Sequence, residues 1–377
     1  MPLGLTLDDA SVLLIWTAVV LYALSFIAYA IDLGVRSAAA TDAKDAAGRG
    51  VNGTSAAGRG SNETSAAKAR ELVGAGAGAS SGSGAVSIEF GDAVAATAVA
   101  PPNRAASAAG SGAGEASTPK RMVMARIGTT LMVLAFLFHL GGTITRGIAA
   151  ERVPWSNMYE FAMTGTLMIV FVYLVVLIRY DLRYLGVLIA GLALVLLGGS
   201  AVTFYVEVVP LAEPLRSVWL VIHVFVATLS TAFFALAFGL SVLQLLQARR
   251  ERLEKLPDSK PLARGLRFLR TLPGADALES LAYRFAIIGF AFWTFTLIAG
   301  SIWAQDAWGR YWGFDTKEVW TFVIWVLYAG YIHARATRGW RGNRSAWLSI
   351  IGFSAVIFNF TIVNMFFKGL HAYSGLT

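Results

Sequence analysis

Residues 158–204 read MYEFAMTGTLMIVFVYLVVLIRYDLRYLGVLIAGLALVLLGGSAVTF, and this segment is the clearest indication of the chain's architecture. It holds two apolar runs with very few charges, 158–178 and 184–204, and each has about the 20 residues that a helix needs to cross a bilayer. The turn between them, Arg179-Tyr180-Asp181-Leu182-Arg183, is short enough to force a reversal of direction. The stretch therefore predicts an antiparallel pair of membrane-spanning helices.

Further apolar runs lie on both sides of this pair. They cover 11–31, 123–146, 217–247, 284–304, 319–336 and 346–366. The run 217–247 is long enough to project beyond the bilayer. The chain is 56% hydrophobic and only 14% charged, with a mean hydropathy of +0.61, which is typical of proteins dissolved in lipid. We therefore predict an all-α, polytopic membrane helix bundle of about eight spans.

The chain divides into three parts by composition. Asp8 and Asp9, rather than basic residues, precede the first apolar run, so 1–36 is predicted to be a first transmembrane helix and not a cleaved signal peptide. Residues 37–118 are rich in Ala, Gly, Ser and Thr and cannot bury enough surface to offset chain entropy. We predict a disordered cytoplasmic linker there, with partner tethering as its alternative role, and a membrane domain over 119–377.

Lysine and arginine gather on one side of the predicted membrane. With the N-terminus outside, the inner loops and span ends carry 25 of the 31 Lys and Arg residues, and the outer side carries 6. This bias predicts the orientation, because such residues accumulate in cytoplasmic loops. It also accounts for the net charge of +8 without a nucleic-acid partner. The chain has no cysteine, which excludes disulfides and thiolate metal sites.

The predicted outer loop 303–320 reads WAQDAWGRYWGFDTKEVW. Four of the chain's eleven tryptophans fall in it, namely Trp303, Trp308, Trp312 and Trp320. An interfacial aromatic belt explains one or two tryptophans at a helix end. It does not explain tryptophans mixed with glycine, aspartate, lysine and glutamate. We therefore expect a flat aromatic platform for a porphyrin, with Arg310 or Lys317 meeting its propionates.

Four segments together carry a resemblance. The loop resembles the tryptophan-rich WWD motif of haem-handling proteins in cytochrome c maturation. The others are PWSNMYE (154–160), SVWLVIH (217–223) and GLHAY (369–373). In combination, over about 120–377, they resemble the CcsA/ResC family of System II, often named CcsB in actinobacteria.

Two positions of the loop depart from the family's motif. Phe314 stands where tryptophan is usual before Asp315, and Thr316 stands where proline is usual after it. Phenylalanine keeps an aromatic face but lacks the indole N–H donor. These two departures affect the prediction of individual contacts in the loop and leave the resemblance to the family unchanged.

Two histidines are predicted near the outer surface. His223 lies about two turns inside the outer end of its span, and Trp219 is one turn above it on the same face. His371 lies just beyond the outer end of the last span. Two neutral imidazoles can ligate haem iron from opposite faces. The resemblance implies that this pair forms the axial ligands of an external haem.

The other two histidines lie deeper. His333 is 13 residues past Trp320, or roughly 20 Å toward the cytoplasm. The resemblance implies that it ligates iron of a second, intramembrane haem; the alternative is a structural histidine near the inner interface. His139 lies roughly 10 Å below the outer surface, so it does not pair with His333. The second ligand would then come from another protein, in agreement with the CcsB/ResB-type subunit that the resemblance implies.

The segment before the third span has two readings. Asn157 is positioned to cap the next helix, and contact with haem is the alternative. The candidate haem-binding residues are, in all, His223, His371, His333, Trp303, Trp308, Trp312, Asp315, Trp320 and Trp219, followed by His139, Arg310, Lys317, Asn157 and Glu160.

The resemblance implies a function in cytochrome c biogenesis at the bacterial inner membrane. Haem b is the expected cargo, relayed outward and presented to the CxxCH segment of apocytochrome c. Haem lyase activity is then expected only in a complex with the CcsB/ResB partner, and a thioredoxin-like reductant takes part indirectly. No side chain is predicted to act as acid, base or nucleophile. The alternatives are a haem exporter without ligation activity and a b-type haem electron carrier.

Overall fold

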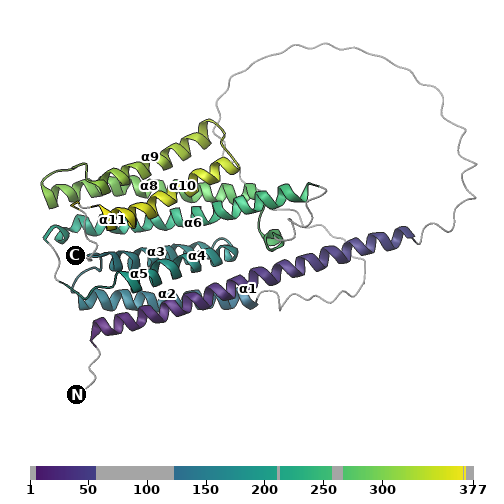
Figure 1. Ribbon diagram of the computed structural model, residues 1–377, viewed down its shortest axis with the longest axis horizontal. Helices are drawn as coiled ribbons and strands as arrows, with labels where there is room; N and C mark the ends of the chain where they lie inside the picture. The colour runs from purple at the N-terminus through teal and green to yellow at the C-terminus, as the bar shows by residue number, and fades with distance from the viewer. Residues whose placement is uncertain (1–5, 57–122, 210–212, 257–265, 368, 371–377) are drawn as a thin grey trace, which may run out of the picture. The chain divides into compact units, whose positions relative to one another are not determined.

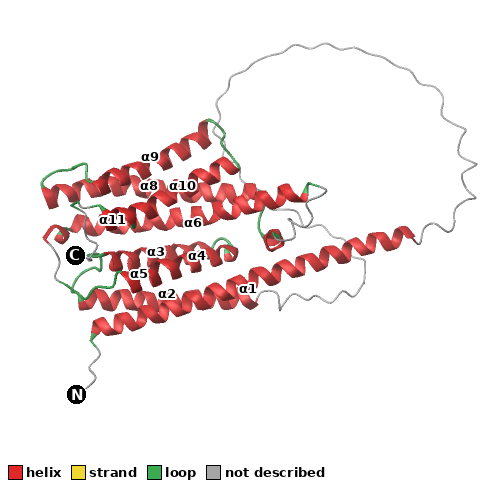
Figure 2. Cartoon of the chain, in the orientation of Figure 1, coloured by secondary structure: helices red, strands yellow, loops and turns green. Residues whose placement is uncertain are grey.

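The computed structural model describes residues 6–56, 123–209, 213–256, 266–367 and 369–370. Every regular element in these ranges is a helix, as predicted, and Figure 2 shows them in red. The α-helices are α1 (Leu7–Ala56), α2 (Val123–Ala149), α3 (Met158–Leu177), α4 (Gly186–Ala193), α5 (Gly199–Thr203), α6 (Val218–Glu254), α8 (Ala275–Trp308), α9 (Thr316–Thr337), α10 (Asn343–Phe360) and α11 (Ile362–Phe366). The short helical turns are η2 (Arg183–Leu185), η3 (Leu194–Gly198), η4 (Glu213–Arg216) and η5 (Arg267–Thr271).

The chain forms two compact units by its internal contacts. The first comprises residues 1–44 and 118–377 and holds the helix bundle. The second comprises residues 45–117, of which the structure describes only the helical residues 45–56.

Seven helical segments of the described chain are long and apolar enough to cross a membrane. They are Leu7–Val35, Val123–Ala149, Met158–Leu177, Arg183–Thr203, Val218–Glu254, Ala275–Trp308 and Asn343–Phe366. These match seven of the predicted spans. The remaining one, 319–336, also forms a helix, α9, but its tryptophans, tyrosines, His333 and Arg335 lower its hydropathy. The protein is therefore a multi-pass membrane protein.

The first helix is longer than predicted. It continues past the apolar span to Ala56, so the predicted linker 37–118 begins as helix. The reason lies in the alanine-rich sequence after Val35, because alanine has the highest helix propensity. Residues 57–118 of the predicted linker lie outside the described residues.

Helix α6 lies at the centre of the bundle. It packs against α3, α8 and α10, while α9 packs against α8 and α10, and α2 packs against α3 on the other side (Figure 1). It has 37 residues, or about 55 Å at 1.5 Å per residue, which is well beyond the ~30 Å hydrocarbon core of a bilayer. The prediction that this helix is longer than a span is confirmed.

Helices α1 and α2 run antiparallel in close contact. Ser11 Oγ donates a hydrogen bond to the Gly142 carbonyl (2.7 Å), and Ser25 Oγ donates one to the Gly128 carbonyl (2.9 Å). A Cβ on Gly142 would lie 2.8 Å from the Ile15 side chain, so the glycine lets the two backbones approach. The first two helices are thus a fixed part of the bundle.

The predicted antiparallel pair over 158–204 is present, with one irregularity. Its second member consists of η2, α4, the π-helical turn η3 and α5. A π-turn shifts the helix register by one residue and is frequent beside functional sites. It places Leu196 in the wall of the central cavity described below.

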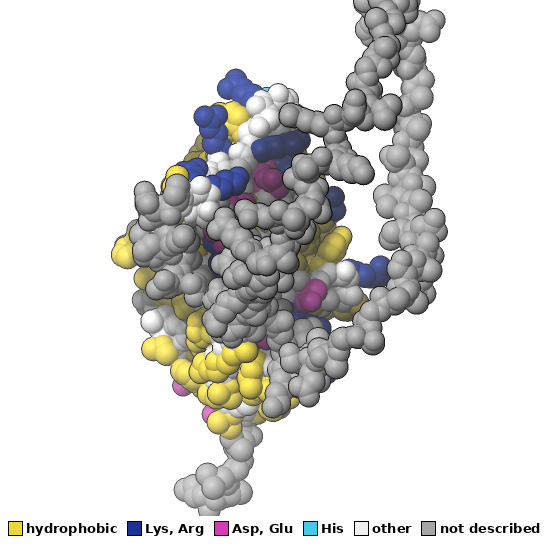
Figure 3. Space-filling view, turned by 90° about the vertical axis from the view of Figure 1, so that its right-hand side faces the viewer, with side chains coloured by type: hydrophobic (Ala, Val, Ile, Leu, Met, Phe, Trp, Pro, Cys, Tyr) yellow, Lys and Arg dark blue, Asp and Glu magenta, His cyan; other side chains and the backbone are white. Residues whose placement is uncertain are grey.

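Lys and Arg side chains gather at one end of the bundle. Helix α6 ends, α8 begins and α9 ends at the same end of the bundle. Figure 3, which looks at this end, shows Lys and Arg side chains gathered there beside hydrophobic ones. The tryptophan-rich loop, 303–320, precedes most of α9 and lies at the opposite end. The loop therefore lies at the other end of the bundle from this group of Lys and Arg side chains.

Candidate functional site

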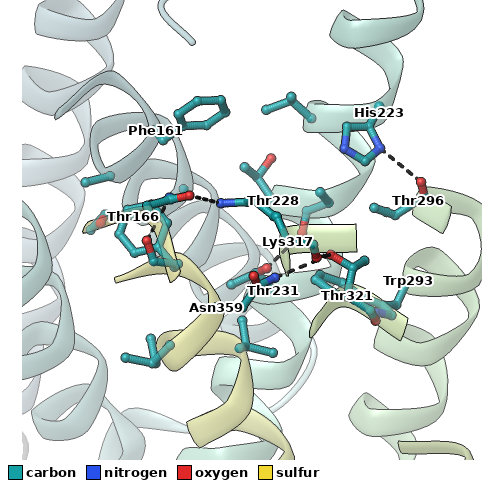
Figure 4. A pocket seen from close by; sticks show the side chains of 18 of the residues that line it. Phe161, Thr166, His223, Thr228, Thr231, Trp293, Thr296, Lys317, Thr321 and Asn359 are labelled. Carbon is teal, nitrogen blue, oxygen red and sulfur yellow. Dashed lines mark hydrogen bonds between the residues drawn. The ribbon is translucent and has the colours of Figure 1, made fainter. Parts of the chain in front are cut away.

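His223 on α6 is fixed by two contacts with α8, and Figure 4 shows the first of them, the hydrogen bond to Thr296. Its Nδ1 donates a hydrogen bond to the Thr296 carbonyl (2.9 Å), and its ring stacks on Trp303 with centroids 5.9 Å apart and planes 17° apart. Because a carbonyl only accepts, a neutral imidazole at this position carries its proton on Nδ1 and its lone pair on Nε2. Metal-ligating histidines typically carry this second hydrogen bond. The tautomer therefore suits a metal ligand.

Gly300 makes room for this imidazole. A Cβ at that position would lie 2.7 Å from Cε1 and 2.8 Å from Nδ1 of His223. Real Cβ atoms do not approach this closely, so any larger residue would displace the ring. Sequence reasoning missed Gly300, because the contact joins residues far apart in the chain.

Two cavities meet at His223. The central one, of about 190 Å³, lies between α3, α6, α8, α9 and α10 and is mostly apolar, with several threonines in its wall (Figure 4). A smaller one, of about 70 Å³, lies beside the tryptophan-rich loop. His223, Trp303 and Lys317 line both. The structure thus brings three predicted site residues together around one space.

Lys317 faces inward from the first turn of α9. Its ammonium donates a hydrogen bond to Asn364 Oδ1 of α11. Asn359, another amide of the central cavity, donates from Nδ2 to Thr321 Oγ1 (3.4 Å), but its Oδ1 has no hydrogen-bond partner within the described residues. The wall of the central cavity formed by α9, α10 and α11 is therefore polar.

The predicted aromatic residues separate into two groups. Trp308 packs edge-on against the buried Trp303 with ring centroids 4.8 Å apart, and Trp219 belongs to the same cluster. Trp312 lines the smaller cavity. Trp320 instead packs on Phe358 of α10 at 4.4 Å, outside the walls of both cavities. Of the four tryptophans in the loop, Trp303 and Trp312 thus line a cavity, Trp308 packs against Trp303, and Trp320 lies apart.

Trp155 also joins the aromatic cluster. It lies in the PWSNMYE segment and packs, at 8% exposure, with Trp303, Leu215 and Leu220. The sequence segment was recognised, but Asn157 and Glu160 were chosen from it rather than this tryptophan.

Asp315 caps α9 and holds the C-terminal segment. It forms a capping box with Glu318, whose Oε2 accepts hydrogen bonds from the Gly313 and Asp315 N–H groups (2.8 and 3.1 Å). Asp315 Oδ1 also accepts from the Leu370 N–H (3.3 Å). A Cβ on Gly369 would lie 2.0 Å from that oxygen, so only glycine permits the approach. His371 lies outside the described residues.

The loop before Asp315 carries backbone strain. Phe314 has a φ of 57° and an 80% exposed side chain. A left-handed conformation costs a non-glycine residue roughly 1–2 kcal/mol. Arg310, exposed, lies against Gly313, where a Cβ would come within 2.3 Å of its guanidinium carbon. Strain of this kind is held in place by the capping box next to it.

The remaining two histidines lie away from both cavities. His333 is exposed on α9, near its C-terminal end. His139 is fully buried in α2, and its Nδ1 lies 3.1 Å from the Tyr22 hydroxyl of α1. Neither residue lines a cavity with His223 in the described structure.

Asn157 and Glu160 fix the start of α3. Asn157 Oδ1 accepts from the Glu160 N–H (2.9 Å) and so caps the helix. The Glu160 carboxylate, fully buried, accepts from Arg146 Nε (3.1 Å) and Arg152 Nη1 (2.7 Å). Arg146 in turn pairs with Asp8 at 2.6 Å. Two arginines and two carboxylates thus form a nearly buried, charge-balanced network that joins α1, α2 and α3.

The network also holds the loop after α5. Arg146 Nη2 donates to the Val206 carbonyl (2.6 Å), and the Tyr205 hydroxyl donates to Asp8 Oδ2 (2.9 Å). Burial, followed by the bond to Asp8, raises the pKa of Tyr205, so the phenol remains a donor at neutral pH. Arg146 and Asp8 were not among the predicted site residues, although a charged residue inside an apolar run is a signal that sequence reasoning can use.

Together these features define a polytopic membrane protein that seats a histidine against tryptophans at one end of its bundle. The family model described as "Cytochrome C assembly protein" matches residues 155–371, which include both the loop and the His223 segment. The protein named cytochrome c biogenesis protein CcsA from Guillardia theta is 32% identical over 262 residues, covering 66% of this chain and 85% of the relative.

A second relative matches over a longer stretch. The cytochrome c biogenesis protein CcsA of Synechococcus elongatus is 32% identical over 290 residues, covering 68% of this chain and 89% of the relative. The chain belongs to the CcsA family of cytochrome c biogenesis proteins.

Proposed function

We propose that the chain relays haem b to the outer face of the bacterial inner membrane and presents it there for attachment to the CxxCH segment of apocytochrome c. The observation that supports this proposal is the position of His223, which its contacts with Thr296 and Trp303 fix. Its Nδ1 is bonded to Thr296, its Nε2 bears the lone pair, and Trp303 lies flat beside it. A neutral imidazole next to aromatic faces is what an axial ligand of a bound porphyrin requires.

The size of the site indicates how haem would enter. The central cavity of about 190 Å³ is smaller than the ~300–1,000 Å³ of typical cofactor pockets. We therefore propose that this cavity widens when a porphyrin binds beside His223. We propose His371 as the second iron ligand. The bond between Asp315 and the Leu370 N–H supports this, since it holds the residue before His371 at the loop.

The attachment step needs orientation more than acid–base catalysis. Each apocytochrome thiol would add across one haem vinyl group: the S–H bond and the vinyl π bond break, a C–S and a C–H bond form, and no oxidant or reductant is needed. The haem supplies the reactive group, while His223 and the tryptophans hold it at a fixed angle. A thioredoxin-like protein would keep the thiols reduced and so acts only indirectly.

The exposure of His333 is evidence for a partner subunit in the membrane. It is exposed on α9, 13 residues beyond Trp320. An ionisable side chain that faces lipid is costly, so exposed intramembrane histidines are expected to meet a partner. We propose that a CcsB/ResB-type subunit covers this face and supplies the second ligand of an inner haem. We propose that the tryptophan-rich loop lies on the outer side; the Lys and Arg side chains gathered at the opposite end of the bundle support this orientation.

Co-expression with a c-type cytochrome reporter is expected to yield covalently bound haem only when this chain and its partner subunit are present. Haem staining after denaturing electrophoresis measures the amount of haem that is covalently bound to the reporter cytochrome. Free haem outside the cell without thioether formation would indicate an exporter instead. A stable, stoichiometric haem that is reduced and oxidised during turnover would indicate an electron carrier.

Replacing Gly300 by alanine is expected to lower the haem absorbance of the purified protein severalfold, because the new methyl group would displace the His223 ring. Gly330→Ala on α9 is the matched control, since a Cβ there meets nothing within 4 Å. Thermal unfolding of both variants checks that the bundle is intact. Equal absorbance in the two variants would contradict this seat for His223.

A further inference from the structure

We propose that the central cavity selects its porphyrin by the two propionate groups, which enter the cavity and meet Lys317, Asn359 and Thr166. This inference rests on the haem function proposed above and names the groups by which the ligand is recognised. All three residues line the central cavity, and Figure 4 labels them together with His223. The vinyl edge of the porphyrin, which is opposite to the propionates, then faces away from Lys317.

Most hydroxyl groups of the central cavity are already used within their own helices. Four threonines of its wall each donate to a carbonyl three or four residues earlier, at 2.7–3.0 Å; they are Thr228, Thr231, Thr296 and Thr321. A hydroxyl that donates to its own helix has no proton left for a ligand. The polar groups that a ligand can use are therefore far fewer than the composition of the wall suggests.

Two buried oxygen atoms in the wall have no hydrogen-bond partner among the described residues. They are Asn359 Oδ1 of α10 and Thr166 Oγ1 of α3, whose residues are 5% and 2% exposed. Asn359 donates from Nδ2 to Thr321 Oγ1 (3.4 Å), so its oxygen remains as an acceptor. Buried polar atoms are nearly always paired in native proteins. These two therefore indicate a ligand that offers both a donor and an acceptor, as a carboxylic acid does.

Lys317 supplies a positive charge to the same cavity. Its ammonium bonds to the neutral amide of Asn364, and within the described parts of the chain no carboxylate lies at ion-pair distance from it. Asp315 attracts it from further away, while Asp315 and Glu318 accept from backbone N–H groups. None of the described residues that line the central cavity is acidic. A ligand carboxylate is thus the ion-pair partner that the cavity lacks.

Together these groups match a porphyrin with two free carboxyl groups. One propionate is ionised and pairs with the Lys317 ammonium. The other stays protonated, because an apolar cavity with one ammonium disfavours a second negative charge, and its O–H donates to Asn359 Oδ1. The Thr166 hydroxyl donates to a remaining carboxyl oxygen. The iron meets His223, and the vinyl edge lies against apolar residues such as Leu220.

The test uses the full-length protein, purified in detergent without haem and titrated with iron protoporphyrin IX or its dimethyl ester. Absorbance of the bound porphyrin measures each affinity. We expect the diacid to bind about a hundredfold more tightly, because the diester can neither pair with Lys317 nor donate to Asn359. Lys317→Met and Asn359→Leu should each reduce this preference about tenfold and bind the diester with wild-type affinity.

The matched controls are Lys255→Met and Asn343→Leu. They make the same two changes at exposed positions that line neither the central nor the smaller cavity, so the preference should stay at the wild-type level.

A haem with one propionate coupled to a bulky amine tests which edge enters the cavity. It should bind about tenfold more weakly than mesohaem, in which both vinyl groups are saturated but the propionates are free. Equal binding of the two would place the propionate edge outside the cavity and overturn the proposal.

The remaining outcomes separate this proposal from the haem function itself. Equal affinity of the wild type for diacid and diester overturns the proposal, as does an unchanged preference in Lys317→Met and Asn359→Leu. Loss of diester binding in these variants overturns it too, since the residues would then maintain the cavity and not bind a carboxyl group. Failure of the wild type to bind either porphyrin, or wild-type binding of both by His223→Ala, would refute the haem site and this proposal with it.

Discussion

His223→Ala is expected to abolish holocytochrome formation and the haem absorbance band of the purified protein. The imidazole is the only described side chain in the two cavities with a nitrogen lone pair suited to iron. Removing it leaves the space beside Trp303 without a ligand. Imidazole in the medium should then restore part of the activity by filling that space. His371→Ala is expected to act in the same way.

Phe225→Ala is the matched control for this experiment. Phe225 lies two residues along α6, is 48% exposed and is absent from the walls of both cavities. It should therefore mature the cytochrome reporter at the wild-type rate. If His223→Ala and His371→Ala also did so, the assignment of the outer haem site would be wrong.

Glu160→Ala is expected to cause the largest loss of stability. The carboxylate is fully buried between Arg146 and Arg152, and the Arg146 side chain is itself fully buried. Removing one member of a buried ion pair typically lowers the free energy of unfolding by about 3–5 kcal/mol, because a buried charge loses its partner. Thermal unfolding in detergent, followed by circular dichroism, measures the change.

Two further variants show whether the loss of stability comes from the charge of Glu160 and from its buried position. Glu160→Gln should lose less, because the amide oxygen can still accept from the Ser156 N–H, which donates to Glu160 Oε2 in the wild type (2.9 Å). Glu207→Ala, in the loop after α5, removes an exposed carboxylate and should leave the unfolding temperature unchanged. Unfolding of Glu160→Ala at the wild-type temperature would mean that the network does not hold the helices together.

The helices were predictable because apolar length dominates in a membrane. Each predicted run forms a helix, and the turn at 179–183 produces the expected reversal. Two features were not predictable from hydropathy. The extension of α1 to Ala56 agrees with the high helix propensity of its alanines, and the π-turn Leu194–Gly198 has no signal in the apolar pattern.

The candidate site was predictable only in its local parts. Trp303 and Trp308 are close in sequence, and His223 was chosen by its depth in the bundle. Its seat was not predictable, because the Thr296 carbonyl is 73 residues away and any residue type offers a carbonyl. The capping role of Asp315 has a local pattern, Asp-Thr-Lys-Glu, which resembles a capping box. The same four residues therefore predict the start of a helix and a ligand contact equally well, and the sequence alone does not separate the two roles.

The ion-pair network has a consequence for what counts as an autonomous folding unit. The region matched by the family model begins at residue 155, yet Glu160 shares its charge with Arg146, which in turn depends on Asp8. A truncated protein that began at 155 would leave the buried Glu160 carboxylate without either of its arginines, Arg146 and Arg152. We therefore expect the region matched by the family model to fold together with α1 and α2 as one cooperative unit.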